Sequence, residues 1–223
     1  MEVQTDKFVQ SSRIAIKDEH LQKAIHKATS LSVRERDYAA AEIDNWEELR
    51  EKARAIKEQT LERLDEYLAL LADSVTRNGG TVHWAESAED AARYIVDLAR
   101  ARGVKTVVKG KSMTSEEIAL NERLEEIGVE PVETDLGEYV VQMAEEKPFH
   151  IIAPAIHKTR QDIGQLFEKR LKVEYEEDPE KLTRIARAEL RDKFCNSDMG
   201  VTGVNFAVAE TGTIVVVENE GNG

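Results

Sequence analysis

The sequence predicts an α/β protein in which a mostly parallel sheet is flanked by helices and preceded by a helical N-terminal region. Three observations support this fold class. Residues 1–78 have helical periodicity, short apolar segments alternate with helical segments after Gly80, and residues 204–223 break that alternation with two adjacent strands. We therefore predict a helical region over residues 1–78 and an α/β domain over residues 79–223.

The N-terminal region contains one strong helical pattern and one weaker one. Apolar residues recur at helical intervals over residues 46–75, which marks one face of a long amphipathic helix. Asp44 or Asn45 can cap its start, and Gly79-Gly80 supplies the positive φ angles that end it. Residues 13–29 predict a weaker helix. The charged faces of both helices are either solvated surface or surface for a partner.

Strands and helices alternate through the next part of the chain, as in βαβ units with a parallel sheet. Ser87 opens the first helix of this part with a pattern resembling a capping box, and Gly103 ends it. Pro179 is placed for the first position of the last helix. The expected strands are 81–84, 105–108, 130–133 and 149–153, and the expected helices are 87–103, 112–128, 136–144, 159–171 and 180–194.

The C-terminal segment predicts a β-hairpin of strands 204–209 and 213–217, with Gly212 in its turn. The second strand is very apolar, and only a short polar segment follows it. We therefore expect the sequence to be a fragment of a longer protein.

Composition excludes several classes of protein. The 223 residues include 44 acidic and 31 basic side chains, a net charge of −13, which disfavours nucleic-acid binding. The 41% of hydrophobic residues argues against disorder. Cys195 is the single cysteine, so the chain can form no internal disulfide, and it cannot by itself hold an iron–sulfur cluster or a Cys-type zinc site. His20, His26, His83 and His150 show no metal-ligand spacing with carboxylates or with Cys195, so a metal site is not expected.

Targeting signals are not evident in the sequence. No stretch approaches the roughly 20 apolar residues of a membrane span. The N-terminus lacks the basic and apolar regions of a signal peptide. The sequence therefore predicts a cytoplasmic protein without a membrane span.

The loop Gly110-Lys111-Ser112 is a candidate anion site. It is not a P-loop, because that motif requires glycine at the position of Lys105. Backbone N–H groups and lysines at the start of the following helix can still hold an anion. The alternative is that Ser112 or Thr114 simply caps the helix.

Carboxylates and a histidine follow two further expected strands. Glu133, Asp135 and Glu138 lie at the carboxyl end of a parallel strand, where open α/β sheets bind ligands. They can bind a polar substrate or shift one another's pKa values, or they can be an acidic helix start. His157 follows the next strand and is either an acid–base or carboxylate-binding group or a packed helix-entry residue.

The approach to the hairpin supplies the remaining candidates. Residues 196–203 are polar and glycine-rich and include Thr202. Glu210 lies in the turn between two apolar strands, so it is either held by neighbouring N–H groups or functional. Cys195 has no evident histidine partner, which disfavours a nucleophilic role.

Four motifs resemble the lactate-utilisation (LUD) family: GKSMTSEEI at 110–118 with Asn121, VETDLGEY at 132–139, IAPAIHK at 152–158 and GVTGVNFAVAETGT at 200–213, with ENEGN following at 218–222. The resemblance covers nearly the whole chain and is strongest to the family's iron–sulfur subunit. It implies the fold of the NagB, ribose-5-phosphate isomerase and CoA-transferase superfamily.

The resemblance also implies a function. It implies one subunit of a three-protein system that oxidises L-lactate to pyruvate, with two 4Fe-4S clusters in a cysteine-rich region that this chain lacks. The partners would be the other subunits and a small carboxylate. The chain itself would bind no cofactor and would not be active alone.

We expect the loops at the carboxyl ends of the strands to form one pocket. Its expected catalytic residues are Glu210 and His157, and its expected substrate- or anion-binding residues are Lys111, Ser112, Asp135, Thr202, Thr211 and Gly212. The turn at Glu210 resembles the Glu-x-Gly turn of CoA transferases. Two alternatives therefore stay open: an enzyme of the CoA-transferase or sugar-phosphate isomerase type that uses Glu210, and an assembly module that docks partners through its N-terminal helices.

Overall fold

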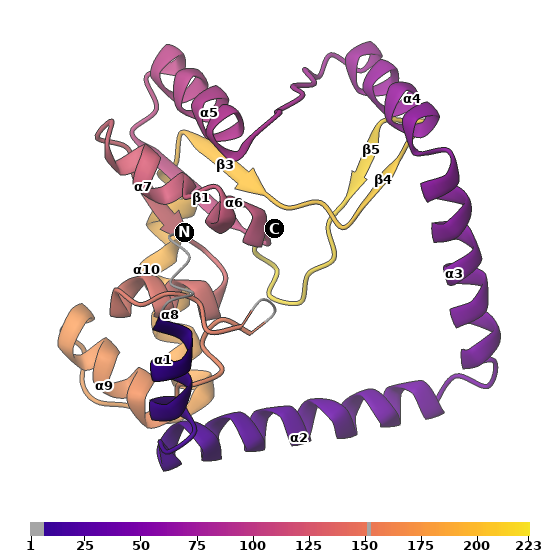
Figure 1. Cartoon of the computed structure of the whole chain (residues 1–223). Coiled ribbons are helices and arrows are strands. Elements are labelled where there is room, and N and C mark those ends of the chain that lie inside the picture. Colours follow the sequence, from indigo (N-terminus) through magenta and orange to yellow (C-terminus); the bar gives the residue numbers. More distant parts are fainter. Residues whose placement is uncertain (1–6, 151–152) are drawn as a thin grey trace. The chain divides into compact units, whose positions relative to one another are not determined.

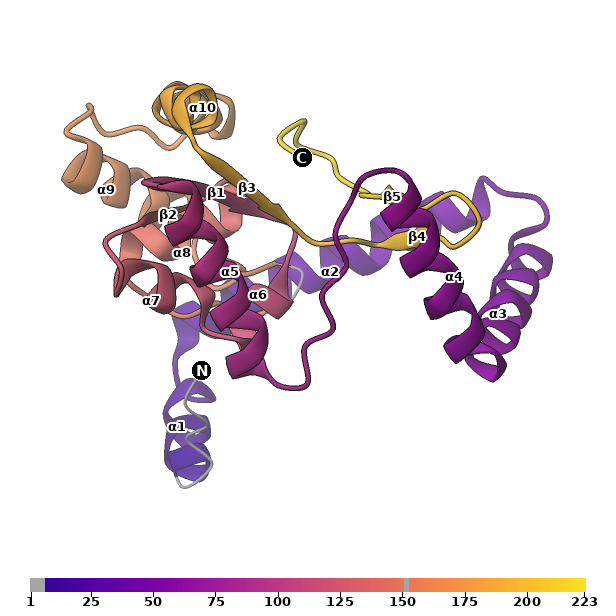
Figure 2. The same ribbon diagram turned by 90° about the horizontal axis from the view of Figure 1, so that it is seen from above.

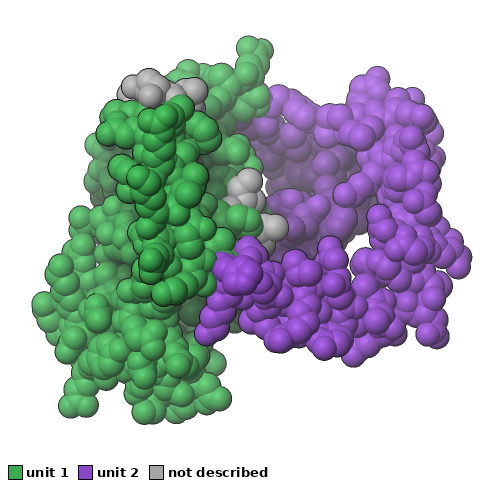
Figure 3. Space-filling view, turned by 60° about the horizontal axis from the view of Figure 1, so that its bottom comes forward, with its two compact units in different colours: residues 1–25, 85–203, 218–223 green, residues 26–84, 204–217 purple. Residues whose placement is uncertain are grey.

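The structure is a computed structural model that describes residues 7–150 and 153–223. The chain divides into two compact units (Figure 3), and each is described by itself. Unit 1 comprises residues 1–25, 85–203 and 218–223, and unit 2 comprises residues 26–84 and 204–217. The predicted domain boundary at residue 78 stays a prediction, because units defined by contacts are not a test of independent folding.

Unit 1 is built on a parallel sheet with strand order β2-β1-β3 in its described residues. Figure 1 labels β1 and β3, and Figure 2 labels all three strands. The strands are β1 (Thr106–Gly110), β2 (Glu130–Glu133) and β3 (Met199–Thr202). Val108 is paired in register with Val132 on one side and with Gly200 on the other. All three strands run in one direction, so the segments that follow them start at the same sheet edge.

Helices cover the sheet on both faces (Figure 2). One core contains Val107 of β1 with residues of α5 (Ala88–Arg102) and α7 (Leu120–Glu125). A second core joins α8 (Leu136–Ala144), α9 (Arg160–Leu171) and α10 (Pro179–Asn196), with Phe167 fully buried. The predicted α/β class is confirmed, and the described sheet is compatible with the superfamily fold that the resemblance implies.

Local sequence signals set the ends of these helices. Ser87 accepts a hydrogen bond from the Asp90 N–H at the start of α5, and Gly103 has φ of 65° at its end. Thr159 and Asp162 form a reciprocal capping box at α9, and Pro179 occupies the first turn of α10. These helices begin and end within about two residues of the predicted bounds.

Unit 2 consists of helices and a two-stranded hairpin. Its helices are most of α2 (Glu19–Ala41), α3 (Trp46–Glu62) and α4 (Leu64–Arg77). The hairpin pairs β4 (Phe206–Val208) with β5 (Thr213–Val215) in antiparallel register. The predicted hairpin is therefore present with shorter strands. No helix in the described part of the chain combines the length and apolar character needed to cross a bilayer.

Several predicted helices are interrupted. The helix expected from residue 46 is broken at Arg63, whose φ of −126° and ψ of 35° are not helical. The helix expected after Ser112 divides into α6 (Met113–Glu117) and α7, because Ala119 has φ of 54°. The weaker N-terminal helix is α1 (Phe8–Ala15) followed by α2. Neither Arg63 nor Ala119 is a helix-breaking residue type, so no local signal marks these two interruptions.

One predicted strand is absent, one is only partly covered by the described residues, and one observed strand was not predicted. Residues 81–84 have no regular secondary structure, so this prediction was wrong. The expected strand 149–153 includes residues 151–152, which lie outside the described residues, and its first two residues form a bend. Strand β3 was missed, because Gly200 and Thr202 interrupt its apolar character.

Candidate functional site

The site begins with one carboxylate that holds the loop after β1. Asp135 follows β2, and its Oδ2 accepts a hydrogen bond of 2.7 Å from the backbone N–H of Lys111. Its Oδ1 accepts a second hydrogen bond from the Lys111 ammonium group. The side chains of Asp135 and Lys111 are 6% and 13% exposed. This charge-assisted pair joins the loops at the ends of two neighbouring strands.

The C-terminal segment adds a third donor to Asp135. The amide Nδ2 of Asn222 donates to Oδ1 of Asp135 and to the backbone oxygen of Thr134, both at 2.8 Å. Glu220 accepts from the backbone N–H of Leu136 at the start of α8. Burial alone would raise the pKa of Asp135, but the hydrogen bonds from Lys111 and Asn222 outweigh it and hold that pKa below its ordinary value. Asp135 is therefore ionised at neutral pH.

Close backbone packing fixes the conformation of Lys111. Its φ of 61° is in the left-handed region, which is unfavourable for a residue with a Cβ atom. A Cβ atom on Gly203 would lie 2.0 Å from the carbonyl oxygen of Lys111, and one on Gly110 would lie 2.8 Å from Oγ1 of Thr134. The loop can approach this closely only because both positions are glycine.

A cavity of about 210 Å³ adjoins this pair. Its wall combines the polar side chains of Lys111, Thr202 and Asn222 with residues of β1 and β3. The lining residues are Val108, Lys109, Gly110, Lys111, Thr134, Phe194, Gly200, Val201, Thr202, Asn222 and Gly223. The volume fits a molecule of a few heavy atoms. An anionic ligand would have to share the Lys111 ammonium group with Asp135.

A second charged cluster is buried on the opposite side of β1. The ammonium group of Lys109 lies 2.7 Å from Oε1 of Glu133 and 2.6 Å from Oε1 of Glu116, and it donates to Oγ of Ser115 at 2.8 Å. Lys109 is only 2% exposed. Asn121 donates to the same Glu133 oxygen at 2.8 Å. The buried ammonium group is thus fully compensated, as a buried charge must be.

An acidic cavity of about 380 Å³ lies beside this cluster. Glu133 and Glu138 line it, together with several exposed carboxylates. Burial raises the pKa of Glu138 to about 7, and the charges of Asp135, Glu133 and Glu220 add to the rise. Burial also raises the pKa of Glu133, although Lys109 and Asn121 oppose it. Of the three carboxylates Glu133, Asp135 and Glu138, it is therefore Glu138 whose pKa is raised by the other two.

His157 belongs to a separate ion-pair group. Its Nε2 lies 2.8 Å from Oε2 of Glu146, and Oε1 of Glu146 accepts a hydrogen bond from Lys158. The ring packs against Phe149 with centroids 5.1 Å apart. Burial would raise the pKa of Glu146, but Lys158 and His157 together lower it. In this arrangement the histidine has a structural partner.

The Glu210 turn is held by α4 within unit 2. Ser74 Oγ donates to the backbone oxygen of Glu210 at 3.1 Å, and Asn78 Nδ2 donates to that of Thr211 at 2.8 Å. Gly212 has φ of 69°, and a Cβ atom there would lie 2.8 Å from the Ser74 backbone. The turn is therefore fixed through its backbone, while Glu210 itself is exposed.

Comparison with known proteins identifies the family. The LUD domain matches residues 68–223, which is most of the chain. The chain belongs to the LUD domain family. It is 46% identical over 222 residues to "Lactate utilization protein B 2" of Bacillus mycoides, and 45% identical to "Lactate utilization protein B" of both Bacillus thuringiensis and Bacillus cereus. Each match covers 100% of this chain and 47% of the relative, so the chain spans about half their length. No solved structure matches.

In the LUD domain, three of the predicted site residues come together in unit 1. Lys111 and Thr202 line the 210 Å³ cavity, and Asp135 holds Lys111. Ser112 accepts from the backbone N–H of Ser115, so it acts as the cap of α6. Thr202 is exposed and donates to the backbone oxygen of Gly203. The functional roles predicted for these residues stay predictions.

The other predicted residues are distributed differently. His157 pairs with Glu146 in unit 1, whereas Glu210, Thr211 and Gly212 belong to unit 2. Asn121 and Asn222 were named only within the motifs that resemble the family, with no role in the site, and the burial of Lys109 was not predicted. A lysine inside an apolar strand was a usable signal, because a charge there needs partners. Asn222 offered no such signal.

The residues of this LUD domain do not fit an iron–sulfur cluster. Such clusters are held by about four cysteine thiolates. Cys195 is the one cysteine in the sequence, and it is exposed. Over residues 7–150 and 153–223, no three His, Cys, Asp or Glu side chains are grouped so that they can hold a metal ion.

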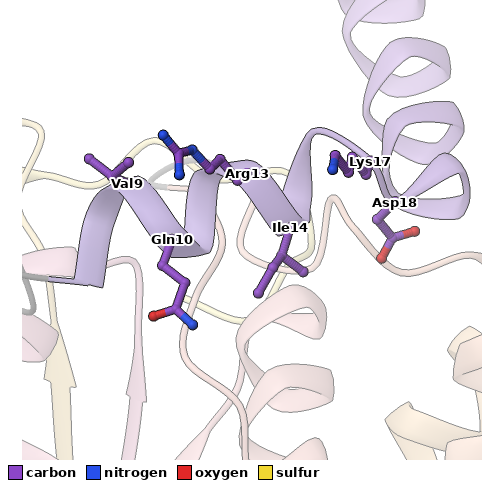
Figure 4. Close-up of a pocket in the computed structure, with 6 residues that line it drawn as sticks. All are labelled: Val9, Gln10, Arg13, Ile14, Lys17 and Asp18. Carbon is purple, nitrogen blue, oxygen red and sulfur yellow. The ribbon is translucent and has the colours of Figure 1, made fainter.

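A further hollow lies along α1 (Figure 4). Its lining residues all come from α1 and the turn that follows it, including Arg13, Ile14 and Asp18. A hollow bounded by one helix and one turn has no opposing wall to orient a ligand. We therefore assign the candidate site to the loops around Lys111 and Asp135.

Proposed function

We propose that this chain is the LUD portion of a protein of L-lactate utilisation, acting in a multi-subunit system that oxidises L-lactate to pyruvate. The observation that supports this proposal is the identity of 45–46% along the whole chain with proteins named for lactate utilization. The matched 222 residues span the loops of the candidate site as well as the core. The partners in this proposal are the other subunits of the system, and the location is the cytoplasm.

The electron-transferring role belongs to the same proposal. Two 4Fe-4S clusters would be held by cysteines outside these 223 residues, because Cys195 is the sole cysteine here. Slightly more than half of each relative lies outside the match and has room for such a region. In this division of roles the LUD portion positions substrate or partners and does not carry the electrons itself.

The proposed ligand of the LUD portion is a small carboxylate in the cavity beside Lys111. The Lys111 ammonium group supplies the charge, and Thr202 and Asn222 supply polar groups around it. Asp135 keeps the ammonium group in place, and the hydroxyl oxygen of Thr202 offers an acceptor for a ligand hydroxyl group. A 2-hydroxy acid carries both a carboxylate and a hydroxyl group, so its chemistry fits the cavity better than that of a simple anion.

A growth experiment tests the proposed function. The matched 222 residues of the Bacillus mycoides protein would be replaced by this chain in a strain that lacks its own copy. We expect the fusion to restore growth on L-lactate, while growth on pyruvate is unaffected in every strain. Failure to grow on lactate, with the fusion protein present at the normal level, would refute the proposal.

A substitution tests the ligand site. Lys111→Met in the fusion should weaken growth on lactate and binding of L-lactate, because the cavity loses the ammonium group proposed to bind the carboxylate. Lys105→Met is the matched control, since Lys105 is exposed just before β1. Equal lactate binding by the two variants would remove Lys111 from the site.

A second candidate function rests on the fixed Glu210 turn. An exposed glutamate on an anchored backbone is available to form an acyl intermediate, as in an enzyme of the CoA-transferase type. Incubation with acyl-CoA or sugar phosphates tests this candidate. Turnover that is lost in Glu210→Gln supports it, and the absence of turnover in the unchanged protein rejects it.

A further inference from the structure

Unit 2 has almost no interior of its own. Ser74 is its one buried residue, and the structure describes every residue of this unit. Helices α2 and α3 contain no buried residue along their whole described lengths. Fixing the backbone of a residue on folding costs about 1–2 kcal/mol of conformational entropy, and the burial of apolar surface normally offsets this cost. Unit 2 lacks that compensation in this chain.

The apolar side chains that should supply the compensation are present but exposed. Trp46, Leu49, Ala53 and Ile56 recur at intervals of three and four along α3, which is the spacing of a helix seam that packs on a partner. Leu49 is 43% exposed and Ile56 is 64% exposed. The β-hairpin also has exposed apolar side chains, and its Phe206 is 60% exposed.

The opposite face of α3 is polar and internally paired. Arg54 bridges Glu51 and Glu58 at 2.9 Å and 3.0 Å, and Arg50 pairs with Glu47. These charges therefore need no external partner. The seam and the paired face lie on opposite sides of one helix, so α3 has a defined docking side that is apolar rather than charged.

The contacts within unit 2 do not cover this side. The Glu210 turn packs on α4 through Ser74 and Asn78, and α3 contacts α4 near Arg63. Neither contact buries a residue of α3. A 17-residue helix is marginal without tertiary packing, and so is an isolated two-stranded hairpin.

We propose that the apolar side of α3 is an intramolecular docking surface for the part of the full-length protein that lies outside these 223 residues. This inference rests on the proposed function, since it takes the chain to be a portion of a longer lactate utilization protein. The relatives match this chain over its entire length, including α2 and α3, and slightly more than half of each relative lies outside the match.

The kind of contact follows from the chemistry of the surface. Interfaces that are permanent are more apolar than transient ones and resemble a domain core cut in half. Unit 2 fits that description, because aromatic or aliphatic side chains are exposed on α2, α3, α4 and the hairpin, among them Leu31, Leu49, Leu70 and Phe206. The occupant is therefore a largely apolar surface that packs against α3 permanently, and the contact should be insensitive to salt.

Hydrogen exchange of the α3 amides tests the docking surface. The 223-residue chain would be compared with the fusion that joins it to the remainder of the Bacillus mycoides protein. We expect the exchange of amides 50–62 to be at least about tenfold slower in the fusion, because docked helices open less often. Equally fast exchange in both proteins would overturn the proposal.

Two other outcomes identify a different occupant and also overturn the proposal. Slow exchange in the 223-residue chain at every concentration would mean that another part of this chain covers α3. Slow exchange that appears only at high concentration would mean that a second copy covers it. Growth on lactate is scored separately, so a fusion with protected α3 that fails to grow would refute the proposed function and leave the docking surface in place.

Matched variants locate the surface on the helix. Leu49→Lys with Ile56→Lys places two lysines on the apolar side, and Glu51→Lys with Glu58→Lys places two lysines on the opposite side. We expect the first pair to abolish the protection of α3 in the fusion and the second pair to keep it within about threefold of the unchanged fusion. Equal loss in both pairs would assign the protection to helix stability and overturn the proposal.

Discussion

Asp135 accepts hydrogen bonds from two groups of the same residue, the backbone N–H and the ammonium group of Lys111. One carboxylate thereby sets both the backbone conformation and the side-chain direction of the residue that follows β1. Because Lys111 has a left-handed backbone, these contacts also hold a conformation that the residue would otherwise leave. The LUD domain thus holds its candidate ligand-binding lysine through one carboxylate, in addition to the close packing of Gly203 on its backbone.

Replacement of this carboxylate should lower stability in a pH-dependent way. Asp135→Asn is expected to reduce the free energy of unfolding by about 1–3 kcal/mol at pH 7, because Lys111 loses its charged acceptor. The folded pKa of Asp135 lies below its unfolded value of about 3.9, so its contribution is complete above that pH. The difference should then disappear as the pH falls through the folded pKa.

Urea unfolding at a series of pH values measures this difference. Asp97→Asn is the control, since Asp97 is exposed and pairs loosely with Arg100 at 3.6 Å. The control should change stability by less than about 0.5 kcal/mol. A loss for Asp135→Asn that does not shrink towards the lowest pH at which the protein stays folded would show that the charge is not responsible.

Addition of one methyl group at Gly203 should disturb the same loop. The Cβ atom of Gly203→Ala would lie 2.0 Å from the carbonyl oxygen of Lys111, which requires a backbone shift. We expect a loss of about 1–3 kcal/mol in the free energy of unfolding. At Gly200 the structure has no described atom within 4 Å of an added Cβ, so Gly200→Ala should be tolerated. Equal melting temperatures for the two variants would contradict the close packing.

The buried Lys109 should be costly to remove alone. Lys109→Met leaves Glu133 and Glu116 close together without their cation, and we expect a loss of about 3–5 kcal/mol. Lys109→Met combined with Glu133→Gln should lose less than the sum of the two single changes. A double-mutant cycle by urea unfolding measures this coupling, and strict additivity would show that the two groups do not interact.

Local signals in the sequence predicted the sheet class and many helix ends. Ser87, Thr159 and Pro179 act within one helical turn of their own position, so their effects can be inferred from neighbouring residues. Strand 130–133 was predicted with its observed bounds, because glycine and a helix flank it. The interruption at Arg63 was missed, because arginine is a good helix former and no neighbouring residue marks a break there.

The candidate site was predicted only where residues share a sheet edge. Lys111 and Asp135 follow neighbouring parallel strands, so topology brings their loops together. Asn222 reaches Asp135 across 87 positions of sequence, and no periodicity encodes that contact. The burial of Lys109 depends on which face of β1 points to α7, and the spacing within one short strand does not decide this.

Glu138 gives a pH dependence of opposite sign to that of Asp135. Burial raises its folded pKa to about 7, whereas the unfolded value is near 4.3, so the folded protein holds the proton more tightly. Stability should therefore fall as the pH rises from about 4.5 to 7 and level off above that range. Glu138→Gln should remove this part of the fall, because glutamine does not titrate.

Urea unfolding of both proteins between pH 4 and pH 8, with Glu122→Gln as the control in the same cavity, measures the effect. Parallel curves for the unchanged protein and Glu138→Gln would contradict the raised pKa, while NMR titration of the Glu138 carboxyl group would report it directly.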